Sequence, residues 1–143
     1  MTFPSDLIFF SASEFKHADL MSVPFLRWLD RVRQRAAAII RRYDTQRDVP
    51  FVITDDARVA SDAEPEGSAG RRSLHHIGCA VDIRSRDWNG LQKWCAAQAI
   101  HELSYEAPGG VEFEMVYSKT DRHWHVGVDP RSYERPELIE SDE

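Results

Sequence analysis

Residues 71–87 read RRSLHHIGCAVDIRSRD, and the fold and the candidate site both follow from this stretch. His75 stands near its start, and Asp82 follows seven residues later inside the apolar segment 79–84. Successive side chains of a strand point to opposite faces, so Asp82 points to one face and its apolar neighbours, Val81 and Ile83, point to the other. An imidazole before a turn and a carboxylate on the next strand are suited to fill two positions of a metal site.

A second histidine-rich stretch, DRHWHV at residues 121–126, supplies the missing ligand. It follows the alternating segment VEFEMVY, residues 111–117, after a short polar connection, and two such segments predict a β-hairpin. Along the second strand His123 and His125 share one face, while Trp124 points to the core. A mononuclear catalytic zinc site takes three ligands from histidines and carboxylates and keeps a further position for water. Such a set is formed by His75, Asp82 and His125.

The periodicity of residues 24–44 predicts a long helix on one side of the sheet. Its apolar side chains recur three and four positions apart, which is the spacing of an amphipathic helix, and Ser22 suits its start. After it, residues 51–54 form a short apolar run bounded by Pro50 and two aspartates, which is typical of a buried strand.

Residues 85–103 predict a second helix, with Ser85 or Asp87 as its cap and Trp94 on its apolar stripe. The predicted fold class is therefore α+β, with a small, mainly antiparallel sheet and helices packed on one side.

Length and composition limit the function further. The 143 residues fit one domain, with an acidic and loosely held tail from about residue 131. The formal net charge of −6 argues against nucleic acid as a partner, because binding a polyanion needs a concentrated positive surface. The two cysteines, Cys79 and Cys95, do not form a disulfide framework and are expected to be free thiols.

The first residues contain a short apolar run, residues 7–10, without a basic segment before it. This pattern predicts neither a signal peptide nor a membrane span. We therefore expect a protein that is made in the cytoplasm and does not insert into a membrane. We also expect it to act as a monomer.

The combination of SLHHIGCAVDI, residues 73–83, with DRHWHV resembles the zinc D-Ala-D-Ala carboxypeptidase and L-alanyl-D-glutamate endopeptidase family. That family shares its fold with lysostaphin-type peptidases and the hedgehog signalling domain. The resemblance covers most of the chain and implies a hedgehog/DD-peptidase-like fold. It also implies a zinc ion bound by His75, Asp82 and His125.

The same resemblance assigns roles to three further residues. His123 would stand beside the metal and orient water or stabilise the oxyanion of a tetrahedral intermediate. Arg58 corresponds to a strand-end arginine that meets a carboxylate of the substrate. Ser73 corresponds to the serine of the motif, which either hydrogen-bonds the substrate or fixes the turn.

The general base is the point at which this sequence departs from the family. A zinc peptidase needs a carboxylate to take a proton from water and pass it to the leaving amine. Family members keep that acid three residues before the last histidine, where this chain has Arg122; the hedgehog-like arrangement keeps it six before, where this chain has Lys119. Asp121 is the predicted substitute, and the alternatives on the partner strand are Glu112 and Glu114.

Two functions follow from these motifs. The first is a zinc-dependent peptidase that cleaves the stem peptides of bacterial peptidoglycan through a metal-activated water. It would be of the D-Ala-D-Ala carboxypeptidase or L-Ala-D-Glu endopeptidase type and serve phage or prophage lysis or cell-wall remodelling, after release to the wall or as part of a virion. The alternative is a non-catalytic zinc-binding module of the same fold that acts in binding or virion structure.

Overall fold

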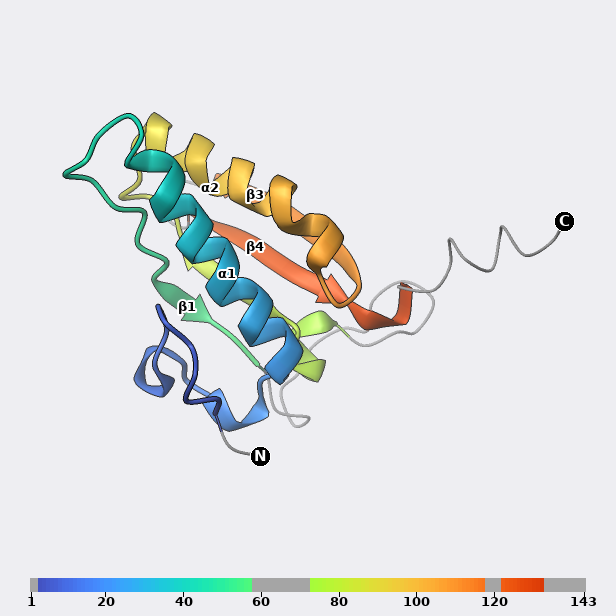
Figure 1. The fold of residues 1–143 in the computed structure, drawn as a ribbon. Coiled ribbons are helices and arrows are strands. Elements are labelled where there is room, and N and C mark those ends of the chain that lie inside the picture. The colour runs from blue at the N-terminus through green and yellow to red at the C-terminus, as the bar shows by residue number, and fades with distance from the viewer. Residues whose placement is uncertain (1–2, 58–72, 118–121, 133–143) are drawn as a thin grey trace, which may run out of the picture.

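The computed structural model describes residues 3–57, 73–117 and 122–132 (Figure 1). These residues form two α-helices, a sheet of four strands and several short 3-10 helices. The helices and strands follow in the order α1 (Val23–Ile40), β1 (Ile53–Asp55), β2 (Ala80–Arg84), α2 (Gly90–Leu103), β3 (Gly110–Tyr117) and β4 (Arg122–Asp129). The predicted α+β class with a small antiparallel sheet is confirmed. Neither α1 nor α2 has the length and apolar character needed to cross a bilayer, and no other helix of the described residues has them.

The strands lie in the order β1-β2-β4-β3, and every neighbouring pair is antiparallel. β2 and β4 are thus the two inner strands, and their register sets Asp82 directly opposite His125. β3 and β4 form the predicted hairpin, in which Glu114 pairs with His125 and Glu112 with Gly127. The topology therefore brings Asp82 and His125, which are 43 positions apart in the sequence, onto adjacent strands.

Both long helices lie on the same side of the sheet (Figure 1). The indole Nε1 of Trp28 on α1 donates a hydrogen bond of 2.8 Å to the carbonyl of Leu103, which ties α1 to the end of α2. The inward side chains of the inner strands complete the core: Val81, Ile83, Trp124 and Val126 are all buried. Because strand side chains alternate, the opposite face, here called the open face, carries Asp82, His123 and His125.

The start of α1 agrees with the sequence prediction, whereas the start of α2 does not. The Ser22 side chain accepts a hydrogen bond from Phe25 N, so Ser22 is the N-cap of α1. The predicted caps of α2, Ser85 and Asp87, are wrong, because Asn89 caps this helix. The chain first makes a turn in which Trp88 N donates to Ser85 O and the Trp88 indole to Pro50 O. Burial of Trp88 thus delays the helix by several residues.

Trp94 does not belong to the buried stripe of α2, contrary to the sequence prediction. The buried side of the helix is made of smaller residues, namely Cys95, Ala96, Ala99, Ile100 and Leu103. Trp94 remains 49% exposed and packs edge-on against the ring of Tyr43, which follows α1.

A short 3-10 helix, η4 (Leu74–Ile77), precedes β2 and carries the first metal-ligand candidate. Gly78 ends it in the left-handed region, with φ at 73°, which residues with a Cβ rarely adopt. A Cβ at Gly78 would also meet the backbone oxygen of Leu20, and Ser22 N donates to Gly78 O. The glycine of the motif is therefore required both by the turn and by close packing against the segment before α1.

Candidate metal centre

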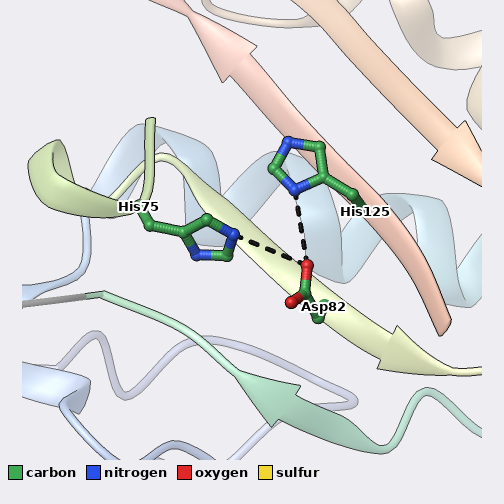
Figure 2. Close-up of side chains that lie close together, drawn as sticks. All are labelled: His75, Asp82 and His125. Atoms are coloured by element: carbon green, nitrogen blue, oxygen red, sulfur yellow. Dashed lines mark hydrogen bonds and ion pairs between the residues drawn. The ribbon is translucent and has the colours of Figure 1, made fainter. Parts of the chain in front are cut away.

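Three side chains from η4, β2 and β4 converge on the open face (Figure 2). Asp82 Oδ1 lies 3.3 Å from His125 Nδ1 and 3.5 Å from His75 Nε2. One ligand atom from each residue lies within 4.8 Å of the other two. The sheet register explains the Asp82–His125 contact, while η4 brings in His75 from the side.

His75 is held in one orientation by two hydrogen bonds. Its backbone N donates to Ser73 Oγ at 3.1 Å, and its ring Nδ1 lies 2.8 Å from the backbone carbonyl oxygen of Asp56. A carbonyl only accepts, so Nδ1 carries the proton and Nε2 is the nitrogen that faces Asp82. The side chain is buried, which leaves this imidazole little freedom to turn away.

The Asp82 carboxylate divides its two oxygens between the three histidines. Oδ1 faces His75 and His125, and Oδ2 lies 3.7 Å from His123 Nε2. Burial would raise the pKa of this carboxyl group, but the hydrogen bonds from His125 and His75 and the charges of His75 and His123 outweigh it. They hold the pKa of Asp82 far below its usual value. Asp82 is therefore an anion at any ordinary pH, as a metal ligand must be.

His125 lies between two carboxylates. Its Nδ1 faces Asp82, while its Nε2 lies 3.2 Å from Glu112 Oε1 on β3. Burial lowers the pKa of this imidazole, but the hydrogen bonds and negative charges of Asp82 and Glu112 prevail, so the pKa is raised above its usual value. In the metal-free protein, a proton on His125 thus has an acceptor at each ring nitrogen.

The residues present fit a zinc ion. Two ligands at the usual zinc distances of 2.0–2.1 Å and a tetrahedral angle are separated by about 3.4 Å. The two edges of the triangle that meet at Asp82 Oδ1, 3.3 and 3.5 Å, already have this length. Two imidazoles and one carboxylate are also a donor set that zinc takes in catalytic sites. The possible metal-binding triad predicted from the sequence is thus present, on the open side of the sheet.

The structure describes only some of the other predicted site residues. His123 shares the open face with His125, as predicted, and contacts Asp82. Ser73 caps η4 and holds the turn that carries His75. Arg58 and Asp121 lie outside the described residues. Arg122 is exposed at the start of β4, where the family has its acid.

Sequence reasoning missed the contact of the Asp56 carbonyl with His75 and left the direction of Glu112 open. A backbone carbonyl has no sequence signal of its own. The direction of Glu112 depends on the hairpin register, which alternation within one strand does not define.

Comparison with known proteins finds no matching family model, no significantly similar curated protein and no significantly similar solved structure. The resemblance carried by residues 73–83 and 121–126 therefore stays a prediction.

Proposed function

We propose that this chain is a zinc-dependent peptidase of the hedgehog/DD-peptidase fold that hydrolyses an amide bond in peptidoglycan stem peptides. The observation that supports the proposal most directly is the triangle of His75, Asp82 and His125, in which the two edges that meet at Asp82 Oδ1 have lengths that suit zinc. It lies on the face of the sheet opposite the two helices. The proposed setting is phage or prophage lysis or cell-wall remodelling.

The chain's own groups have distinct tasks in this proposal. Zinc bound at the site would lower the pKa of water and polarise the scissile carbonyl. The Asp56 carbonyl keeps His75 Nε2 directed at the site, and His123 holds the second oxygen of Asp82. In the reaction His123 would also stabilise the oxyanion, and Asp121 would take the proton and deliver it to the leaving amine. Arg58 would bind a carboxylate of the substrate, while Ser73 fixes the turn.

One observation favours a second candidate, a zinc-binding module without catalysis. Arg122 occupies the position of the family's general base and is exposed, so a cation stands where the reaction needs a carboxylate. Such a module would keep His75, Asp82 and His125 for stability and bind the cell wall or a virion component without cutting it.

The two candidates are separated by incubating purified, zinc-loaded protein with peptidoglycan and measuring released peptides and new amino groups by mass spectrometry. The peptidase predicts a defined fragment whose mass identifies the bond that is cut. H125A should release none because a metal ligand is lost. D121A should lose most of the activity while it keeps its zinc.

Zinc-loaded wild-type protein that releases nothing would contradict the peptidase and leave the binding module. Full activity of D121A would contradict only the choice of Asp121 as the base.

A further inference from the structure

Glu112 offers an acceptor to the outer nitrogen of His125. Its Oε1 lies 3.2 Å from Nε2, on the side of the ring that does not face Asp82. The residue sits on β3, the edge strand, two residues before Glu114, which pairs with His125. Its side chain is 52% exposed, so no core packing demands this direction.

His75 has the same arrangement with its two nitrogens exchanged. There, Nδ1 donates to the Asp56 carbonyl and Nε2 faces Asp82, whereas in His125 Nδ1 faces Asp82 and Nε2 faces Glu112. Histidines that bind a metal usually donate the other ring N–H to a carbonyl or a carboxylate, which fixes the tautomer and makes the ligand more basic. Each imidazole of the triangle thus has an acceptor of this kind.

We propose that Glu112 is a positioning residue of the metal centre: it accepts the Nε2 proton of His125 and thereby selects Nδ1 as the metal ligand. The inference rests on the metal site of the proposed function but does not require the peptidase reaction. Among the three ligands, only Asp82 supplies a negative charge to the zinc ion. The carboxylate of Glu112 adds a second negative charge nearby, which should strengthen zinc binding.

The contact also bears on the choice of general base. A carboxylate that holds His125 Nε2 is engaged on the outer side of the ligand, away from the atoms that would surround the metal. Glu112 therefore has a different task from the proton transfer assigned to Asp121. Zinc affinity distinguishes the two roles, because loss of the Glu112 carboxylate should weaken zinc binding, whereas loss of the Asp121 carboxylate should not.

The test measures the zinc affinity of E112A and E112Q against wild type by competition with a chromophoric chelator. E112A should bind zinc about 10-fold to 100-fold more weakly, the loss usual for removal of such a partner. E112Q keeps an acceptor oxygen without the charge and should lie between E112A and wild type. E114A is the matched control, because Glu114 is a neighbouring exposed glutamate on the same strand. It should bind zinc like wild type, and backbone amide spectra of all variants check that they fold.

Long-range proton–nitrogen NMR on the zinc-loaded protein gives a readout that a merely structural role would not change. In wild type, His125 should carry its proton on Nε2, slowly exchanging with solvent, and in E112A this proton should exchange faster. A wild-type His125 with its proton on Nδ1, or an E112A affinity equal to that of E114A, would overturn the proposal. Absence of zinc binding in wild type would overturn the metal centre as well. Normal zinc behaviour without peptide hydrolysis would overturn the peptidase alone.

Discussion

Gly127 on β4 links the packing of the open face to the position of His75. A Cβ at this residue would lie 3.0 Å from each of Ala80 Cβ, Cys79 O and Leu74 Cδ1. Carbon atoms in contact are normally about 3.5–4.0 Å apart, so each neighbour of a G127A side chain would have to move by a few tenths of an ångström. Cys79 O is fixed by the hydrogen bond from Val128 N, whereas Leu74 belongs to η4. The strain at Leu74 Cδ1 should therefore displace η4, and His75 with it.

The expected effect of G127A has two parts. Overpacking of a buried site costs about 1–3 kcal/mol, which in a domain of this size lowers the Tm by roughly 3–9 °C. The second part concerns zinc. At a zinc concentration 100 times the Kd, linkage stabilises the wild-type fold by about 2.7 kcal/mol, and a tenfold loss of affinity leaves about 1.4 kcal/mol. Displacement of His75 should thus reduce the zinc-induced rise in Tm to roughly half.

Thermal unfolding with and without zinc separates these two parts. G90A is the control, because a Cβ at Gly90, the first residue of α2, would meet no described atom within 4 Å apart from its chain neighbours and the backbone of its own helix. It should keep or raise the Tm and leave the zinc response unchanged. A G127A protein that is destabilised but gains as much from zinc as wild type would refute the reasoning that the η4–Gly127 contact positions His75.

Two further predictions concern charged groups around the centre. The buried Asp56 carboxylate accepts hydrogen bonds from Lys16 N and His17 N, so D56A should lower the free energy of unfolding, measured with urea, by about 1–3 kcal/mol. Zinc affinity should change little, because the Asp56 carbonyl that holds His75 remains, and a large loss would contradict this assignment. The raised pKa of His125 stabilises the metal-free fold fully below about pH 6.5, and this contribution is lost as the pH rises through the raised value. Zinc competes with that proton, so the zinc-induced rise in Tm should grow above pH 6.5, and a rise independent of pH would contradict the role of His125.

Local patterns predicted the elements that carry the site. Alternation predicted β2 and the hairpin, because Asp82, His123 and His125 interrupt otherwise apolar strands at a period of two. The helical spacing predicted α1 together with its cap, Ser22. These features depend on residues that are close in the sequence, which is why the sequence alone predicted them.

Features that depend on distant contacts were not predictable in the same way. The start of α2 at Gly90 reflects burial of Trp88 and its bond to Pro50 O, although Asn89 and Gln92 do form a capping box. The partners of the two ring nitrogens are Asp56 O, just after β1, and Glu112 on β3, and no local pattern in the sequence places either of them beside its histidine. Sequence thus predicted the candidate ligands and the turn held by Ser73, but not the acceptors of the second ring nitrogens of His75 and His125.

The central claim is that His75, Asp82 and His125 bind one metal ion. Its most direct test is an equilibrium titration of the metal-free chain with zinc, in competition with a chelator, for wild type and D82N. The account predicts saturable uptake of one zinc per chain by wild type and none at the same concentrations by D82N, whose amide replaces the anionic oxygen shared by both histidines. No saturable uptake by wild type, or equal uptake by D82N, would contradict it.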